Sequence, residues 1–492
     1  MKYYSTRDNS RQFSAAQAIA RGLAADGGLF VPASLPRLED GELNRLMSMD
    51  YRQRAAHIMG KFLDDFTADE LAAFCKAAYG ENYDTPDIAP LNVRDEDTAV
   101  LELWHGPTCA FKDMALQMLP HLLTASLKKC GESREVCILV ATSGDTGKAA
   151  LEGFADVPGT RIVVFYPEDG VSDVQKLQMA TQTGENVLVS AIVGNFDDAQ
   201  TGVKTIFNDK EFAELLDRRG FFLSSANSIN WGRLLPQVVY YISAYCDFVA
   251  SGKVKMGEKI NFCVPTGNFG NILAGWYARQ MGLPVGRFIC ASNRNNVLTD
   301  FIQTGTYDKN RPFHCTISPS MDILVSSNLE RLLYACCGDD VQVAAYMDSL
   351  NRTGSYTVSK EILQRIHDDF SAGFCSDDET RAEIAEMFAQ GYLMDPHTAV
   401  AWHVLKEYRS KSGDETPAVV VSTASPYKFC DSVLAALGEQ TDAPGTELLG
   451  RLEDRTGTKA PKPLAALAGK PVRFTGCVDK TGLRALVDGF LK

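Results

Sequence analysis

Lys112, in the stretch HGPTCAFKD (105–113), is the residue of this chain best suited to covalent chemistry. A lysine amine condenses with an aldehyde to form an imine when its surroundings keep it neutral. Considered alone, Lys112 is better explained as an ordinary charge on a helix, because most lysines are exposed. Three loops of small residues follow downstream, each between a predicted strand and a predicted helix. These loops favour the chemical interpretation.

The first loop is ATSGDTGKAA (141–150). Its backbone N–H groups at a predicted helix start, with the hydroxyls of Ser143 and Thr146, suit an anion. It is not a nucleotide P-loop, because only two residues separate its glycines and alanine, not serine or threonine, follows the lysine. The alternative is a simple helix start in which Ser143 or Asp145 is the N-cap.

The other two loops point to a phosphate and to an aromatic ring. In PTGNFGN (265–271), Gly267 and Gly270 permit the positive φ and close approach of a phosphate nest. The pattern is not GxGxxG, and no acidic ribose partner follows it, so a phosphomonoester fits better than a dinucleotide. In STASPYKF (422–429), Thr423 offers a hydroxyl that can meet a pyridine nitrogen without a charge, although a plain turn is the alternative.

Two further motifs carry polar groups. NSINWGR (227–233) combines amides, a hydroxyl and Arg233, which suits a carboxylate or a phosphate, although this arginine could also stack on Trp231. DPHTAVAW (395–402) is typical of a helix start. His397 within it is predicted to be structural, because nothing nearby in the sequence pairs with it as a base. One lysine together with several phosphate-sized cradles predicts a pyridoxal phosphate site.

The elements that must position these groups alternate between short β-branched runs and helical patterns from about residue 93 onward. This alternation predicts an α/β fold with a mainly parallel sheet, whose ligands bind beyond the carboxyl ends of the strands. Residues 309–395 are predicted to be mostly helical, and the tail after Gly445 irregular. The expected strands are EVCILVAT (135–142), RIVVFYP (161–167), ENVLVSAIVG (185–194), KINFCV (259–264) and PAVVVST (417–423).

The length, charge and cysteine content of the chain exclude several classes of protein. The chain has 492 residues, and its net charge of -13 argues against nucleic-acid binding and against a polybasic membrane contact. No stretch reaches the roughly 18 apolar residues of a membrane span, and the N-terminus lacks the apolar core of a signal peptide. The 13 cysteines include no CxxC pair, which predicts reduced, often buried thiols. We therefore expect a cytoplasmic protein without a metal site.

Taken together, the motifs resemble the threonine synthase family, whose members are fold-type II pyridoxal-phosphate enzymes. The resemblance covers nearly the whole chain, and the long N-terminal portion is similar to the fungal and enterobacterial branch, so no S-adenosylmethionine effector is expected. It implies two open, twisted, mainly parallel-sheet lobes. It also implies a helical N-terminal region (1–92), a catalytic domain (93–445) with its smaller lobe at about 130–230, and a C-terminal tail (446–492). The motifs appear in the order ADGGLFVP (25–32), HGPTCAFKD, TSGDTG, NSINWGR, VPTGNFGN, SPSMDI (318–323), DPHTA and TASPYKF.

The resemblance also implies roles for individual residues. Lys112 would link covalently to the cofactor aldehyde, and Thr423 would face the pyridine nitrogen. Asp145 would contact the cofactor 3-hydroxyl, where a carboxylate beside a phenolate repels unless one is protonated. The cofactor phosphate would be held by Gly267, Asn268, Phe269, Gly270 and Asn271. The substrate would be bound through its carboxylate by Ser143 and Thr146, and through its phosphate by Asn227, Ser228 and Arg233.

The implied reaction converts O-phospho-L-homoserine and water to L-threonine and phosphate, with the released Lys112 amine as the base. The alternatives are a phospholyase or a serine/threonine dehydratase that releases a 2-oxo acid, and a non-catalytic ligand-binding protein on the same scaffold. NSINWGR argues against the dehydratase because it provides for a second anion, and an intact lysine argues against the binding protein. We expect a small-molecule substrate and a monomer or homodimer.

Overall fold

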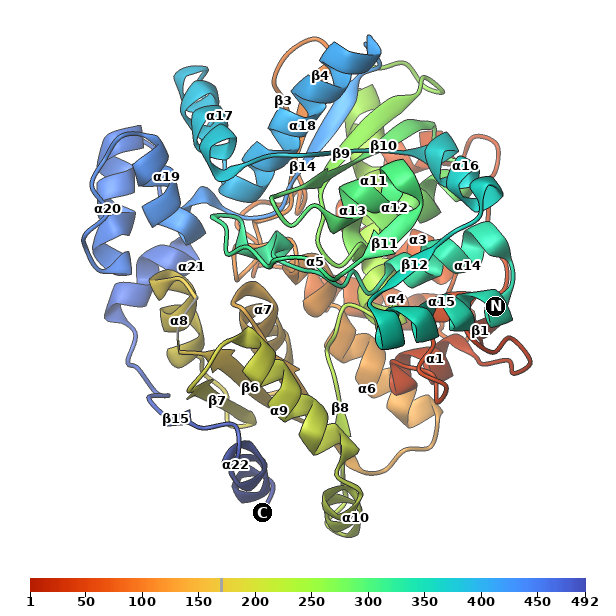
Figure 1. Cartoon of the computed structure of the whole chain (residues 1–492), viewed down its shortest axis with the longest axis vertical. Coiled ribbons are helices and arrows are strands. Elements are labelled where there is room, and N and C mark those ends of the chain that lie inside the picture. Colours follow the sequence, from red (N-terminus) through yellow and green to blue (C-terminus); the bar gives the residue numbers. More distant parts are fainter. Residues whose placement is uncertain (169–170) are drawn as a thin grey trace.

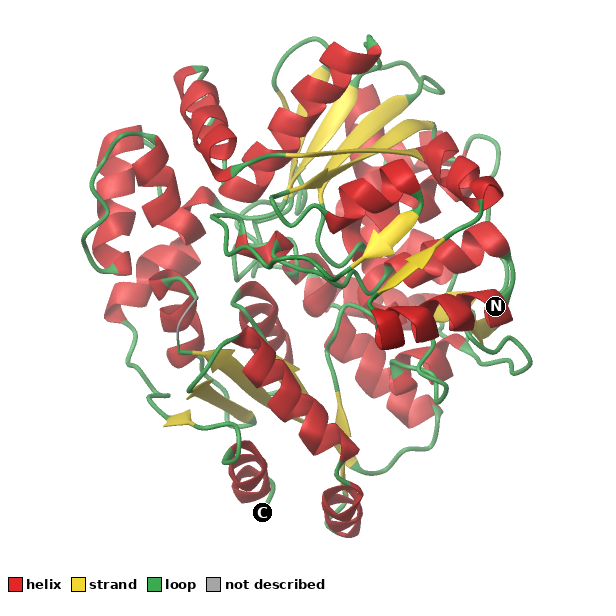
Figure 2. Cartoon of the chain, viewed as in Figure 1, coloured by secondary structure: helices red, strands yellow, loops and turns green. Residues whose placement is uncertain are grey.

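The computed structural model describes residues 1–168 and 171–492. Its core is two separate sheets, each flanked by helices, which form a larger and a smaller lobe (Figure 1). Figure 2 shows that helices dominate the chain around both sheets. The predicted α/β class with two mainly parallel sheets is therefore confirmed.

The large sheet is built from β3 (Leu91–Val93), β4 (Thr98–Glu102), β9 (Ile260–Pro265), β10 (Val285–Ser292), β13 (Phe370–Phe374) and β14 (Ala418–Ser422). Its strand order is β13-β10-β9-β14-β4-β3, and the strands are parallel except that β3 runs antiparallel to β4.

Side chains alternate between the two faces of this sheet, as the pleat requires. Phe262 and Val264 belong to the core cluster under the helices α11 (Trp231–Ala250) and α12 (Gly270–Gln280). Cys263, between them, belongs to the cluster under α18 (Pro396–Ser412). Residues 262–265 of β9 (FCVP) are all apolar because helices cover both faces of the sheet there.

The small sheet is built from β5 (Glu135–Ala141), β6 (Thr160–Pro167), β7 (Val187–Ile192), β8 (Phe221–Ser224) and β15 (Cys477–Val478). Its order is β15-β7-β6-β5-β8, and it is parallel throughout. Val136 and Ile138 face the cluster that includes α7 (Asp145–Phe154). Cys137 and Leu139 face the cluster that includes α9 (Phe196–Asn208) and α22 (Leu483–Phe490).

The N-terminal region combines helices with one short hairpin, in which β1 (Tyr3–Ser5) pairs antiparallel with β2 (Phe30–Pro32). Its helices are α1 (Ala15–Arg21), α2 (Glu42–Met47), α3 (Tyr51–Gly60) and α4 (Ala68–Ala78). The other helices before the end of the small lobe are α5 (Asp113–Leu116), α6 (Leu119–Lys129), α8 (Asp173–Ala180) and α10 (Lys210–Arg218).

The chain between 309 and 395 is largely helical, as expected. A small antiparallel pair, β11 (Thr306–Asp308) with β12 (Ser355–Thr357), lies among these helices. The remaining elements around the large sheet are α13 (Val297–Thr304), α14 (Leu329–Cys337), α15 (Asp340–Thr353), α16 (Lys360–Asp369), α17 (Asp377–Ala389) and α19 (Cys430–Ala436), with short 3-10 turns η1 (Pro319–Met321) and η2 (Pro426–Phe429).

The expectation of an irregular tail was wrong in part. Residues after 445 form α20 (Gly445–Thr456), α21 (Lys462–Ala465), the turn η3 (Ala466–Gly469), strand β15 and α22. Leu483 and Val487 of α22 are buried against the small lobe, and β15 extends its sheet (Figure 1). The longest stretch of the tail without helix or strand runs from 470 to 476. This stretch, which contains a lysine and a proline, is irregular as expected.

All 13 cysteines lie within the described ranges and are unpaired, and most are buried. No helix in those ranges combines the length and apolar composition that a membrane crossing requires.

Candidate active site

A cavity of about 1060 Å³ lies where the loops after β5, β9 and β14 meet the segment that carries Lys112. Because these strands belong to both sheets, the cavity lies between the lobes. Asp145 does not line the cavity, but its carboxylate lies within 3.7 Å of the Lys112 amine, which does. The predicted site residues that line it are Lys112, Ser143, Thr146, Asn227, Ser228, Arg233, Gly267, Asn268, Phe269, Gly270, Asn271 and Thr423.

Lys112 is held in place from the large lobe. Phe111 donates its N–H to the carbonyl oxygen of Thr423 at 2.8 Å, and Ala110 bridges to Ala424, so the lysine segment is tied to the loop after β14. The Lys112 amine lies 3.4 Å from Ser320 Oγ.

The charge state of Lys112 follows from its neighbours. Burial lowers the pKa of its amine, Asp145 opposes this, and the positive charges of Lys428 and Arg233 lower the pKa further. The net direction is downward, which eases the loss of the proton that an imine-forming lysine and a base must both release.

Asp145 forms a buried ion pair that the sequence did not indicate. Its Oδ1 lies 2.6 Å from Lys428 Nζ and accepts a hydrogen bond from Gln175 Nε2 at 2.7 Å. Burial opposes ionisation of this carboxyl, but the charges of Lys428 and Lys112 outweigh it and hold the pKa of Asp145 below its usual range. Asp145 is therefore a carboxylate whose charge is balanced by Lys428.

The loop after β9 has the form of a phosphate cradle. Phe269 is left-handed at φ 62°, and α12 starts at Gly270 with no side-chain cap from the described residues, so its first N–H groups remain open to an anion. A side chain on Gly267 would place its Cβ 2.7 Å from the carbonyl oxygen of Ser320, so only glycine fits there.

Asn271 adds a further donor to this cradle. Its Oδ1 accepts hydrogen bonds from Tyr240 and Tyr241 at 2.6 and 2.7 Å. Its Nδ2 is buried with no partner in the described chain. A buried donor without a partner is costly, and an anion in the cradle would satisfy it. These residues fit the phosphate end of a pyridoxal phosphate.

The loop after β5 provides the start of α7. Gly144 occupies the N-cap position at φ 139° and has no side chain that could cap the helix, so the interpretation of Ser143 or Asp145 as an N-cap was wrong. Thr142 Oγ1 instead accepts hydrogen bonds from the N–H groups of Gly144 and Gly147, at 3.0 and 2.9 Å, and fixes the loop. Ser143 and Thr146 line the cavity at the start of α7, where the positive end of the helix dipole suits a carboxylate.

Arg233 is a buried guanidinium without a carboxylate partner among the described residues. It is 3% exposed, donates from Nη1 to the carbonyl oxygen of Ala226 at 2.8 Å, and has no partner for Nε in the same ranges. Burial lowers the pKa of Arg233 to about 10, so it stays charged at neutral pH. Such a group in a cavity wall is suited to bind an anion, because a buried charge needs a partner.

His397 was predicted to be structural on the ground that nothing nearby in the sequence pairs with it, and that ground was wrong. It lines the cavity, but its Nδ1 pairs with Asp395 Oδ1 at 2.8 Å and its Nε2 accepts the N–H of Ser320 at 3.1 Å. Both ring nitrogens are therefore engaged, and the ring holds Ser320 beside Lys112. Asp395 is also the N-cap of α18, as expected for this motif.

Three polar side chains around Lys112 and Asp145 were not predicted from the sequence: Ser320, Lys428 and Gln175. The first two lie in motifs already singled out, SPSMDI and TASPYKF. The sequence could have indicated Lys428, because it is a lysine among apolar and small residues directly after a predicted buried strand. Gln175 had no signal, since α8 begins like an ordinary capped helix.

Known families match this chain in three segments. Residues 98–424 match the family "Pyridoxal-phosphate dependent enzyme", residues 2–79 match "Threonine synthase N terminus", and residues 398–487 match "Threonine synthase, C-terminal". The chain is 44% identical over 433 residues to the human protein "Threonine synthase-like 1", covering 86% of this chain but only 58% of that protein. It therefore spans about three fifths of the length of that relative.

Two further relatives match over nearly their full length. The threonine synthase of Pseudomonas aeruginosa is 40% identical over 448 residues, which is 90% of this chain and 92% of that protein. The crystal structure of a threonine synthase from Brucella melitensis superposes with a TM-score of 0.88 at 37% identity, covering 100% of this chain and 98% of the other. The chain belongs to the threonine synthase family of pyridoxal-phosphate-dependent enzymes.

Proposed function

We propose that this protein is a threonine synthase, which converts O-phospho-L-homoserine and water to L-threonine and phosphate. The observation that carries the proposal is that one cavity joins three groups: a lysine of lowered pKa, a phosphate cradle and a separate buried arginine. The arginine supplies an anion site beyond the one that the cofactor phosphate needs, and it has no carboxylate partner in the described chain.

The cofactor end of the site is supported by the residues around the cradle. When bound, pyridoxal phosphate supplies an aldehyde that condenses with amines and a ring that stabilises negative charge on the adjacent carbon. Lys112 would provide the amine, the loop from 267 to 271 would hold the phosphate, and Thr423 would face the ring nitrogen. For Asp145 we propose a contact near the 3-hydroxyl, where Lys428 offsets the repulsion expected from its negative charge.

The substrate end needs two anion sites, because phosphohomoserine carries a carboxylate and a phosphate. We assign the carboxylate to Ser143 and Thr146 at the start of α7, and the phosphate to Asn227, Ser228 and Arg233. The charge of a buried guanidinium favours a dianionic phosphate over a neutral hydroxyl, so the site favours phosphohomoserine over serine or threonine.

Lys112 moves protons in this proposal. Once released by the substrate, its neutral Nζ takes the proton from the substrate Cα and passes it to the bound cofactor, so that it can take a second proton from Cβ, after which the γ-phosphate leaves. It then returns a proton to Cγ, water adds at Cβ, and a proton is restored to Cα before L-threonine is released. Ser320 Oγ, 3.4 Å from both Lys112 Nζ and Asp145 Oδ2, keeps the amine directed into the cavity. Closure of the lobes would exclude stray water during these steps.

A cytoplasmic location and a monomeric or homodimeric state belong to the same proposal. The location is supported by the unpaired cysteines of the described chain, since reduced thiols are typical of that compartment. The division into a region 1–92, a catalytic domain 93–445 and a tail 446–492 also remains a proposal. Light scattering of the purified protein measures the oligomeric state directly, and a tetramer or larger assembly would contradict it.

The test of function measures phosphate, threonine and 2-oxobutyrate together, with phosphohomoserine as the substrate. Equal amounts of phosphate and threonine are expected. Phosphate with 2-oxobutyrate would instead identify a phospholyase, and no turnover by cofactor-loaded protein would leave only a binding role. Lys112→Ala is expected to abolish turnover and the near-visible absorbance of the bound cofactor. If that absorbance persists, another lysine holds the cofactor.

A further inference from the structure

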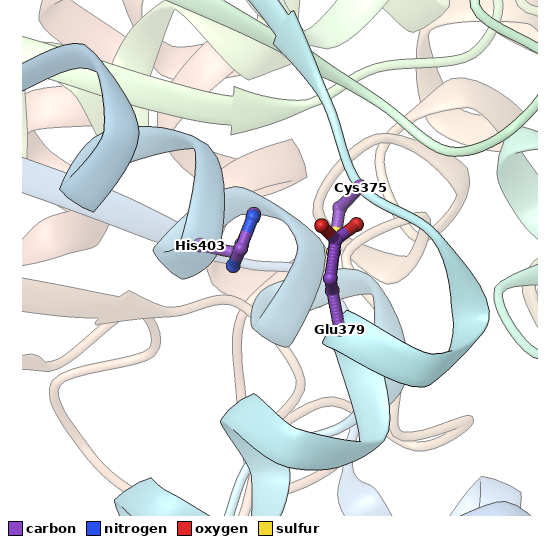
Figure 3. Close-up of side chains that lie close together, drawn as sticks. All are labelled: Cys375, Glu379 and His403. Atoms are coloured by element: carbon purple, nitrogen blue, oxygen red, sulfur yellow. The ribbon is translucent and has the colours of Figure 1, made fainter. Parts of the chain in front are cut away.

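A second group of reactive side chains lies apart from the active-site cavity. Cys375 follows β13, Glu379 lies in the first turn of α17, and His403 lies within α18 (Figure 3). One ligand atom from each comes within 4.8 Å of the other two. None of the three lines the cavity that contains Lys112. We call this group the Cys–Glu–His cluster.

The backbone holds the cluster in place. Cys375 donates its N–H to the carbonyl oxygen of Ser292 at 3.0 Å, which ties it to the end of β10. Glu379 Oε2 accepts hydrogen bonds from the N–H and hydroxyl of Ser376, at 2.8 and 2.7 Å, in the capping box of α17. This leaves the Oε1 atom of Glu379 for another partner. The three ligands come from separate elements, which explains why no short metal-binding motif is visible in the sequence.

The surroundings of the cluster carry more negative than positive charge. Glu383 is 3% exposed, and its Oε2 lies 3.4 Å from His403 Nδ1, while its Oε1 lies 2.9 Å from Lys406 Nζ. An open hollow of about 500 Å³ adjoins these side chains and gives an ion and its water access from solvent. The charged residues that line the hollow are Glu379, Glu383, Glu386, Lys406, Glu407 and Lys411, with His403 beside them.

The donor set identifies the class of ion. Calcium and magnesium prefer ligand shells made only of oxygen, whereas a thiolate, an imidazole and a carboxylate together are typical of Zn²⁺. We propose that Cys375, Glu379 and His403 bind one Zn²⁺ ion, with water from the hollow as the fourth ligand. In a tetrahedral site the ligand atoms lie about 3.3–3.8 Å apart, so the cluster needs to contract by only about 1 Å.

Binding changes the protonation of the cluster. Without metal, burial raises the pKa of the Cys375 thiol to about 12, and the thiol contacts Thr380 Oγ1 at 3.3 Å. On binding the thiol loses its proton to solvent, and the sulfur–zinc bond replaces this contact. Zinc affinity is therefore expected to increase with pH.

The ion would clamp α17, α18 and the end of β13 together. Helix α18 begins at Pro396, and the next residue, His397, accepts a hydrogen bond from Ser320 in the active site. The bound ion would therefore stabilise a helix that supports the active site. The proposal does not depend on which reaction the enzyme catalyses.

The test titrates Zn²⁺ into the cofactor-loaded protein after dialysis against a chelator, with isothermal calorimetry as the readout. The wild type is expected to bind one equivalent and to unfold at a higher temperature with the metal. Cys375→Ser and His403→Ala are expected to lose both effects. Cys477→Ser, at an exposed cysteine outside the cluster, is the matched control and should behave like the wild type.

Co²⁺ provides an independent readout. In the wild type it is expected to give the visible absorption of a tetrahedral site with a thiolate ligand, at longer wavelength than the cofactor band. Cys375→Ser changes only sulfur to oxygen and is therefore expected to preserve the fold. An unfolding midpoint without metal that equals that of the wild type verifies this. The absence of saturable Zn²⁺ binding in the wild type, or equal binding by wild type and both variants, overturns the proposal.

Discussion

Replacing Lys428 by methionine removes the nearest positive charge from the buried Asp145 carboxylate. Lys428 is fully buried and its Nζ lies 2.6 Å from Asp145 Oδ1, so solvent does not screen the pair. Methionine retains much of the apolar volume of lysine but supplies neither charge nor hydrogen-bond donor. The variant therefore leaves Asp145 with three partners: Gln175 at 2.7 Å, Ser320 at 3.4 Å and Lys112 at 3.7 Å.

Removal of one member of a buried ion pair costs about 3–5 kcal/mol of stability, because the other charge is left unpaired in a poorly polarisable interior. Since Gln175 and Lys112 remain near Asp145, we expect the lower end, about 3 kcal/mol. The assay is urea unfolding at neutral pH. The control is Lys411→Met at the exposed Lys411–Glu407 pair, 2.9 Å apart, which should cost less than about 0.5 kcal/mol.

A double-mutant cycle with Asp145→Asn separates the ion pair from general effects of lost packing. Without the carboxylate, Lys428→Met should cost about 2 kcal/mol less than in the wild type. If the effects of the two substitutions on the free energy of unfolding are additive, Lys428 and Asp145 do not stabilise the protein as an ion pair. Because the pKa of Asp145 is lowered from 3.8, its contribution to stability is present above pH 3.8 and is lost as the pH falls through the lower, folded value.

Three further predictions concern the surroundings of the site. Burial opposes protonation of His105, but Asp84 and Glu102 raise its pKa to about 9, so its stabilising effect is complete below pH 6.5 and is lost as the pH rises through 9. His105→Gln should remove this part of the pH dependence of the unfolding midpoint. Gly267→Ala should weaken cofactor binding by about tenfold or more, measured by fluorescence titration, because its Cβ would lie 2.7 Å from a carbonyl oxygen. Arg233→Met should raise the KM for phosphohomoserine by about 30-fold, equivalent to about 2 kcal/mol, and an unchanged KM would exclude Arg233 from the phosphate site.

The strands that were predicted from sequence are those with continuous β-branched runs. The observed β5, β6, β7, β9 and β14 agree with the expected ranges to within two residues at each end. Strands with weaker patterns were missed. For example, β13 has the sequence FSAGF, in which a glycine interrupts the pattern, and it is a strand because its neighbour β10 supplies the hydrogen bonds.

The helical tail was missed for a similar reason. The amphipathic pattern of α22 is short, and the helix is stabilised by packing on the small lobe, which no local signal describes. The short strand β15 likewise depends on the edge of β7.

The sequence alone predicted the candidate reactive groups and the loops that carry them, because strand, glycine-rich turn and helix start are local patterns. Lys112, the loop from 267 to 271 and Thr423 were predicted in this way, and all of them line one cavity. Tertiary structure decided which charges meet. Lys428 lies 2.6 Å from Asp145 although the two belong to motifs far apart in the chain. Cys375 comes close to His403 because the end of β13 packs on α18. Burial and distance set the protonation of these groups, and both arise only when the elements that carry them are packed together.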